Sequence, residues 1–167
     1  MATLREQFID QLKDTYDAEK QILEALPKLV AAASDEELKA TFSDHLQQTH
    51  GHVERLERIF SDLGESNFRK SCKGMKGLIE EGKEALEGPS SATRDAALIA
   101  AAQKVEHYEI AAYGTLRSWA EELELDEAAE LLDETLDEEA SADEKLTSIA
   151  EGGLIETGVN EEATASR

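Results

Sequence analysis

The chain has 167 residues, which is enough for one domain with a sizeable hydrophobic core. Aromatic residues make up 5% of it and there are 2 prolines, while alanine, leucine and glutamate dominate, so the composition favours an all-α protein. The formal net charge of -21 repels nucleic acid and anionic membranes, and neither is an expected partner. A salty cytoplasm, in which ions screen the self-repulsion, explains such acidity better than a specific function does.

Cysteine usage and the N-terminal sequence indicate a cytoplasmic protein. Cys72 is the single cysteine, which excludes an intramolecular disulfide framework and a cysteine-based zinc site. The first residues lack the basic region and apolar run of a signal peptide, and no window is apolar and long enough to span a membrane. We therefore expect a reducing, cytoplasmic environment.

The first two predicted helices form an antiparallel pair. Apolar residues recur at three- and four-residue spacing over residues 3–33, which predicts a helix capped by the threonine at its start. Ser34 and Glu37 read as a capping box that opens a second helix, over about residues 35–63. Gly64 ends that helix. The connection between the two helices is very short, so they should lie side by side.

The rest of the chain completes a four-helix plan. Residues 64–91 are punctuated by glycines and form a long crossover, in which a short amphipathic helix is predicted within 73–86. Further long helices are predicted for about 91–122 and 126–151. The pattern predicts an up-and-down four-helix bundle over residues 1–151. The polar, aperiodic residues 152–167 are expected to form a flexible tail.

Each long helix carries polar groups near its midpoint, on a face that is otherwise apolar. They are Glu19, His45, Gln48, His52, Glu106, Glu109 and Glu139. Because midpoints of similar helices lie at one level in a bundle, these side chains should meet in one layer of the core. Free carboxylates cannot share a dry core, since desolvation and mutual repulsion are prohibitive. One or two divalent cations would neutralise them, and oxygen-rich ligation with some imidazole suits iron or manganese.

Each of these residues alone also has a purely structural interpretation. Glu106 lies at the edge of the stripe that contains Glu109, where a glutamate usually reaches solvent. His45 and His52 taken singly are expected to be packed and hydrogen-bonded, and Asp143 to lie at the surface or behind a ligand. We favour the metal site because acids at the middle of three helices coincide in level with a polar patch on the fourth.

Several stretches of the sequence resemble the ferritin-like YciE/YciF (DUF892) family. They are DTYDAEKQ at 14–21, HLQQT at 45–49, VERLE at 53–57, MKGLIEE at 75–81, RDAALIAAAQKVEHYE at 94–109 and TLDEE at 135–139. The resemblance covers nearly the whole chain except the tail. It implies a ferritin-like four-helix bundle with a short extra helix in the crossover, usually assembled as a homodimer. It also implies a stress-associated protein with a suspected di-metal centre that resembles that of rubrerythrin.

The resemblance implies which residues would bind the two ions. The acids that match the ferritin-like pattern on the first, third and fourth helices are Glu19, Glu106, Glu109 and Glu139. The second helix departs from the pattern, because Gln48 stands where the family often has an acid, and this weakens the second metal position. His45 or His52 would compensate. On the fourth helix, Ala142 stands where a histidine completes the pattern, and Asp143 is the nearest candidate ligand.

Two functions from different classes follow. The first is a centre that holds a carboxylate-bridged pair of iron or manganese ions and activates dioxygen or peroxide, which are small oxidants. Such a centre would oxidise ferrous iron or reduce peroxide. In this interpretation His107 would orient one of the acids. The alternative is a metal-poor, dimeric structural or interaction protein of the stress response, whose inner acids are protonated or linked by water. Gln48 and the missing histidine favour that alternative.

Overall fold

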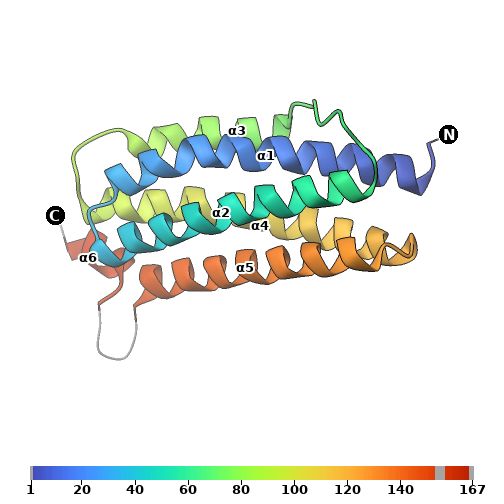
Figure 1. The fold of residues 1–167 in the computed structure, drawn as a ribbon. Helices are drawn as coiled ribbons and strands as arrows, with labels where there is room; N and C mark the ends of the chain where they lie inside the picture. The colour runs from blue at the N-terminus through green and yellow to red at the C-terminus, as the bar shows by residue number, and fades with distance from the viewer. Residues whose placement is uncertain (1, 153–156, 166–167) are drawn as a thin grey trace.

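Four long helices pack into a bundle in the computed structural model, which describes residues 2–152 and 157–165. They are α1 (Leu4–Ala32), α2 (Glu36–Asp62), α4 (Ala92–Glu122) and α5 (Asp126–Glu151). The pairs α1/α2 and α4/α5 are antiparallel neighbours, and α1 also packs on α4 and α2 on α5 (Figure 1). No helix in the described part of the chain is long and apolar enough to cross a membrane. The predicted all-α bundle is confirmed.

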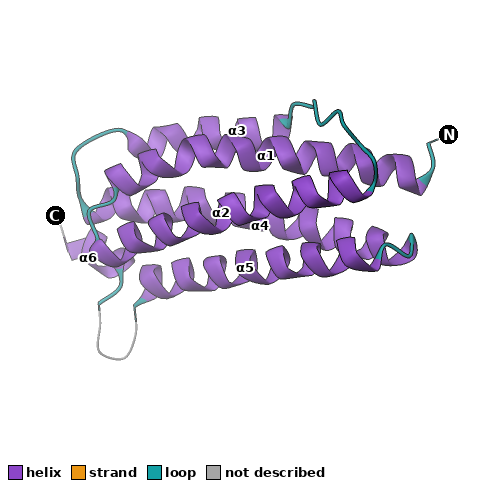
Figure 2. Ribbon diagram, viewed as in Figure 1, coloured by secondary structure: helices purple, strands orange, loops and turns teal. Residues whose placement is uncertain are grey.

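A helical crossover joins the two pairs. It contains α3 (Lys73–Gly82) and the 3-10 helix η1 (Lys83–Leu86), and it runs along the outside of the bundle against α1 and α4. The crossover returns the chain to the end at which α2 began, so α2 and α4 run in the same direction (Figure 1). Figure 2 shows that loops occupy the connections between helices and the short N-terminal segment before α1. The predicted short helix within residues 73–86 is confirmed.

Side-chain caps fix where the helices begin. Thr3 and Glu6 form a reciprocal capping box at the start of α1, and the hydroxyl of Ser91 accepts the backbone N–H of Arg94 at the start of α4. The capping box predicted for Ser34 is wrong, because Asp35 caps α2 by accepting the N–H of Leu38. A carboxylate one residue later competes for the same exposed backbone donors and prevails.

The buried carboxylate of Asp95 ties the α1–α2 connection to α4. Its Oδ1 accepts the N–H of Ser34 at 2.8 Å and its Oδ2 accepts the N–H of Asp35 at 2.9 Å. Asp95 is only 2% exposed, so water cannot easily replace these bonds. Two backbone donors of a tight turn are thereby satisfied by one anion that belongs to the other helix pair.

The C-terminal residues differ from the predicted flexible tail. Residues 159–165 form α6 (Val159–Ala165), which packs on α4 and α5. Val159 is 3% exposed and joins the core of the bundle. One buried valine followed by a helical turn is too short to produce an apolar period, which is why the sequence pattern did not show it. For residues 153–156 and 166–167 the prediction lies outside the described residues.

A layer of polar side chains divides the hydrophobic core into two clusters. One cluster includes Ile22, Leu26, Phe42, Leu98 and Leu146, and the other includes Phe8, Leu12, Leu56, Phe60 and Leu116. Between them lie buried polar residues from all four long helices, namely Thr15, Glu19, His45, Thr49, His52, Glu106, Glu109, Thr135 and Glu139. The predicted single layer at the middle of the bundle is therefore present.

The Asp95 anchor gives the first prediction. Asp95→Ala should lower the free energy of unfolding by about 3 kcal/mol, because it leaves two buried backbone N–H groups without an acceptor. Chemical denaturation followed by far-UV circular dichroism measures this loss. Glu122→Ala, at an exposed site on the same helix, is the control and should change stability by less than about 0.5 kcal/mol. Equal losses in the two variants would contradict the assigned role.

Candidate metal centre

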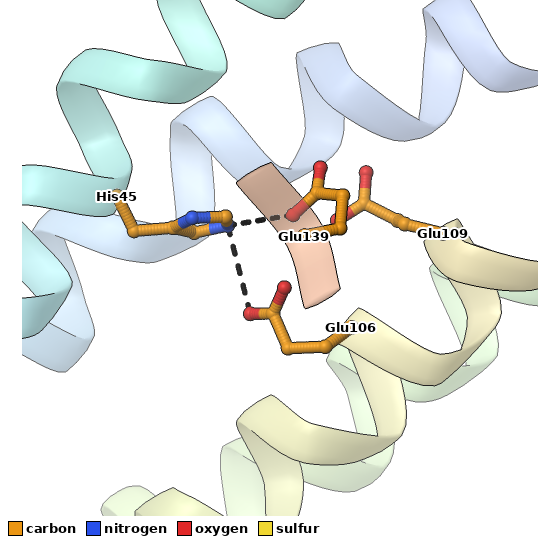
Figure 3. Close-up of side chains that lie close together, drawn as sticks. All are labelled: His45, Glu106, Glu109 and Glu139. Atoms are coloured by element: carbon orange, nitrogen blue, oxygen red, sulfur yellow. Dashed lines mark ion pairs between the residues drawn. The ribbon is translucent and has the colours of Figure 1, made fainter. Parts of the chain in front are cut away.

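The first group of converging ligands contains one imidazole and three carboxylates. One ligand atom from each of His45, Glu106, Glu109 and Glu139 lies within 4.8 Å of the others. The Nε2 atom of His45 is 3.5 Å from Oε1 of Glu106 and 3.6 Å from Oε2 of Glu139. Figure 3 shows these side chains pointing towards one another from α2, α4 and α5. All four are buried, with exposed fractions between 0% and 4%.

The second group lies beside the first and contains Glu19, His52 and Glu139. The Nδ1 atom of His52 is 3.1 Å from Oε1 of Glu139 and 3.3 Å from Oε1 of Glu19. The hydroxyl of Tyr113 donates a hydrogen bond to the same Oε1 of Glu19. This group joins α1, α2 and α5, so the two groups together draw ligands from all four long helices.

Glu139 belongs to both groups. Its Oε2 faces His45 and its Oε1 faces His52. A carboxylate that offers one oxygen to each of two neighbouring positions has the geometry of a bridging ligand. The arrangement therefore places two groups of potential ligands side by side, with Glu139 common to both.

Buried polar atoms without hydrogen-bond partners mark both positions. Among the described residues, such atoms include Oε2 of Glu19, Oε2 of Glu106, both carboxylate oxygens of Glu109 and Glu139, both ring nitrogens of His45, and Nδ1 of His52. Leaving one such group unsatisfied costs about 1–3 kcal/mol, and more if it is charged. A concentration of unsatisfied oxygen and nitrogen atoms that face one another is what a cation site requires, so the residues present fit a metal.

Side chains outside the two groups hold His52 in a ligand orientation. Its Nε2 is 2.8 Å from Oε2 of Glu138, and Glu138 in turn accepts two hydrogen bonds from Arg55. A histidine that ligates a metal through one ring nitrogen usually donates the other N–H to a carboxylate, which fixes the tautomer. Here Nε2–H binds Glu138 and leaves Nδ1 directed at Glu19 and Glu139.

The electrostatics of the layer oppose free anions. Burial raises the pKa of Glu109 well above its ordinary value, and the neighbouring carboxylates of Glu139, Glu19 and Glu106 raise it further. Burial likewise raises the pKa of Glu106, although His45 opposes the shift. Without a cation, the layer therefore retains protons on these acids. A divalent cation would displace those protons and restore the carboxylates.

The pKa of His52 is also raised, which in a histidine favours the charged form. Burial alone lowers its pKa, but the carboxylates of Glu139 and Glu19 outweigh burial and raise the pKa of His52 to about 11. The imidazolium form would partly neutralise the acids in the absence of metal. Burial and the charge of Glu19 also raise the pKa of Tyr113, so its hydroxyl stays protonated and donates to Glu19.

Three residues named from the sequence lie outside the two groups. Gln48 is half-buried on α2, whereas its neighbour Thr49 is fully buried and its hydroxyl donates to the carbonyl of His45. Asp143 binds Gln103 and faces Nε2 of His107 at 3.2 Å. His107 is largely exposed, and the acid that it faces is Asp143, which lies outside the two groups.

Glu106 lies closer to the centre than the sequence indicated. The sequence placed Glu106 at the edge of the apolar stripe, but Glu106 is 3% exposed, whereas Val105 and Ala112 on the same helix are only half-buried. The buried face of α4 instead follows Leu98, Ala102, Glu106, Glu109, Tyr113 and Leu116. A helix rich in alanine gives little contrast between its faces, so its orientation about the axis is poorly defined by hydrophobicity alone.

The structure adds two residues that the sequence patterns did not mark as part of the site. Tyr113 follows Glu109 by one helical turn on the buried face, and this spacing is the available signal for it. Glu138 adjoins Glu139 but points towards α2, where Arg55 and His52 bind it. Pairing with residues on another helix leaves no signal in the spacing along one helix.

Both imidazoles of the site come from α2. His45 and His52 are seven residues apart, which places them two turns apart on one face of the helix, and their ring centroids are 6.1 Å apart. Ala142 on α5 is buried but has no ligand atom. His45 thus supplies the nitrogen donor that α5 lacks, and the first group keeps one imidazole without a histidine after Glu139.

Comparison with known proteins decides the family. The profile described as "Domain of unknown function (DUF892)" matches residues 3–164. The chain belongs to this family. It is also 52% identical over 154 residues to the protein YciF of Escherichia coli strain K12, a match that covers 90% of this chain and 92% of the relative.

Solved structures of relatives have the same fold. The crystal structure of the stress protein YciF of Escherichia coli matches with a TM-score of 0.82 at 52% identity, over 89% of this chain and 94% of that one. A protein from Rhodopseudomonas palustris described as "YcfI, a putative structural protein" matches with a TM-score of 0.85 at 41% identity, over 89% and 96% of the two chains.

A more distant match bears on the fold alone. A two-domain protein of Anabaena variabilis, described as containing DJ-1/ThiJ/PfpI-like and ferritin-like domains, matches with a TM-score of 0.58 at 20% identity. The match covers 88% of this chain and 36% of the other. Together with the helix arrangement, it confirms the ferritin-like class of this member of the DUF892 family.

The raised pKa of Glu109 gives a prediction for protein stripped of metal. A carboxyl whose pKa is higher in the folded than in the unfolded state stabilises the fold below its ordinary pKa, and this contribution is lost as pH rises through the raised value. From about pH 5 to pH 8, the free energy of unfolding should therefore fall more steeply in the unmodified protein than in Glu109→Gln. The difference in slope reaches at most about 1.4 kcal/mol per pH unit.

Denaturant titrations at a series of pH values, in the presence of a chelator, measure the two slopes. Glu122→Gln removes an exposed carboxyl of the same helix and should follow the unmodified protein. Parallel profiles for Glu109→Gln and the unmodified protein would show that Glu109 is ionised alike in both states, against the assigned burial effect.

Proposed function

We propose that this protein binds two divalent metal ions, iron or manganese, in the polar layer of its bundle. The observation that carries the proposal is the pair of ligand groups joined by Glu139, whose inward oxygens and nitrogens otherwise lack partners. The four carboxylates of the two groups are those of Glu19, Glu106, Glu109 and Glu139, and their four negative charges equal the charge of two divalent cations. Buried charge is then balanced within the layer.

The donor set favours iron or manganese over other metals. Four carboxylates and two imidazoles form an oxygen-rich set with some nitrogen. The described part of the chain brings no thiolate to the site, because Cys72 lies at the start of α3. Copper and structural zinc prefer sets richer in nitrogen or sulfur, and calcium prefers oxygen alone.

When bound, a carboxylate-bridged pair of such ions supplies the chemistry to oxidise ferrous iron with dioxygen or to reduce peroxide. The chain's own residues prepare the site for this. Two apolar clusters seal the layer from both ends of the bundle and restrict water. Glu138 holds the N–H of His52, and Tyr113 holds a proton at Oε1 of Glu19, where it can be given to or taken from a small oxidant.

A second candidate is a structural role in the stress response without bound metal, performed by a homodimer. It is supported by the absence of a ligand side chain at Ala142 and by the half-buried position of Gln48. The relative from Rhodopseudomonas palustris is also described as a putative structural protein. In this case Glu106 and Glu109 would stay protonated, as their raised pKa values allow.

Metal content distinguishes the two functions. The protein, purified without chelator and loaded anaerobically with ferrous iron or manganese, should retain about two ions per chain by mass spectrometry. Glu109→Ala should lose the ion of the first group and Glu19→Ala that of the second, and each should retain about one. Glu139→Ala removes the shared ligand and should lose both.

Asp137→Ala is the matched control, since it removes an exposed acid of the same helix and should keep both ions. Exposure of the iron-loaded protein to air should then produce ferric absorbance in proportion to the bound iron. A folded protein that retains no metal would overturn the proposal and leave the structural role.

A further inference from the structure

A largely apolar pocket opens between the crossover and the bundle, next to the candidate metal centre. Its walls come from α1, α3, η1 and α4, and include Ile22, Leu26, Leu29, Leu78, Ile79, Leu86, Ala102 and Val105. The pocket encloses about 630 Å³ of empty space, including the solvent at its mouth. The crossover helices, which pack on α1 and α4 in Figure 1, thus form one wall of a cavity rather than only a connection.

The polar residues of the pocket lie in two places. His45 and Glu106 line it at buried positions, with 4% and 3% exposure, and both belong to the first ligand group. Figure 3 shows their side chains facing one another at the edge of that group. The inner part of the pocket therefore reaches the candidate metal centre, and the wall between the centre and this side of the molecule is apolar.

Lys28 and Lys83 line the pocket at exposed positions and mark its mouth. Among the residues that the structure describes, neither ammonium group forms an ion pair. Lys104, on the neighbouring face of α4, is by contrast paired with Glu81. In a chain with a net charge of -21, these two lysines offer unpaired ammonium groups at the mouth of an apolar cavity.

We propose that this pocket binds an amphipathic carboxylic acid with an unbranched aliphatic tail. The carboxylate lies between Lys28 and Lys83, and the tail extends along the apolar walls towards His45 and Glu106. Binding itself does not require a bound ion. One part of the inference rests on the proposed function, namely that the tail ends next to a metal centre. If that centre is loaded, the pocket holds the ligand close to an oxidising site.

Charge decides the orientation of the ligand. A carboxylate placed at the inner end would meet Glu106 and, behind it, Glu139, and would lose its hydration in an apolar passage. An ammonium head group at the mouth would meet two lysines. A carboxylate at the mouth keeps its hydration and gains two opposite charges, while the methylene groups leave water at about 0.8 kcal/mol each.

Binding of three ten-carbon probes to chelator-treated protein tests the proposal by isothermal titration calorimetry. Decanoate should bind at one site per chain, 1-decanol should bind more weakly, and decylammonium should bind most weakly. This order is opposite to the one that general attraction of cations to the acidic surface would produce. Methyl resonances of Ile22 and Leu26 should shift on addition of decanoate, since both line the pocket. Equal or tighter binding of decylammonium would overturn the assigned head group.

Two sets of variants locate the site. Ala102→Leu fills the inner part of the pocket and should weaken decanoate binding at least about ten-fold, whereas Ala112→Leu makes the same change on α4 outside the pocket and should not. If Ala102→Leu fails to fold, Val105→Phe replaces it. Lys28→Gln with Lys83→Gln should weaken decanoate about five-fold and leave 1-decanol unchanged, with Lys145→Gln on α5 as the control.

The outcomes are separable from those for the metal. Decanoate binding without metal retention would overturn the proposed function and leave this inference intact. Metal retention without decanoate binding would overturn this inference and leave the proposed function intact. Absence of decanoate binding, together with a dimer that dissociates in Lys28→Glu with Lys83→Glu, would show that a second copy of the chain covers the pocket, and would also overturn the inference.

Discussion

The sharing of Glu139 between two ligand groups is the interaction on which the rest of the structure depends. It brings four carboxylates and two imidazoles into one buried layer, where each uncompensated charge costs several kcal/mol. Every long helix contributes to this layer, so the relative rotation and height of all four helices are tied to one set of contacts. The two apolar clusters on either side supply the burial that makes the layer dry.

Elements outside the layer serve this arrangement. Asp95 fixes the turn between α1 and α2 to α4 and so sets the register of the two helix pairs. Arg55 and Glu138 hold the ring of His52 from outside the core. The crossover lies over α1 and α4, where it closes one side of the bundle and forms the pocket that reaches His45 and Glu106. Burial, charge balance and access are thus distributed over different parts of one fold.

The elements and their level in the bundle were predictable from the sequence, but their orientation was not. Capping residues, glycines and the spacing of apolar residues located the long helices within a few residues. Glu19 and Glu139 were assigned to one layer because each lies near the middle of its helix. The alanine-rich face of α4 gave too little contrast to show that Glu106 is central. Gln48 was placed by its spacing in the polar patch of the second helix and then matched to a family position, but it is only half-buried, whereas Thr49 is fully buried. Contacts between helices, such as that of Glu138 with His52, have no trace in a single sequence.

The central claim is that two adjacent ions share Glu139, and anomalous X-ray scattering from a manganese-loaded crystal tests it most directly. Data collected at the manganese absorption edge should give two peaks in the polar layer, one beside His45 and Glu109 and one beside His52 and Glu19, with Glu139 between them. A map without a peak in this layer, or with manganese bound only at surface carboxylates, would contradict the account.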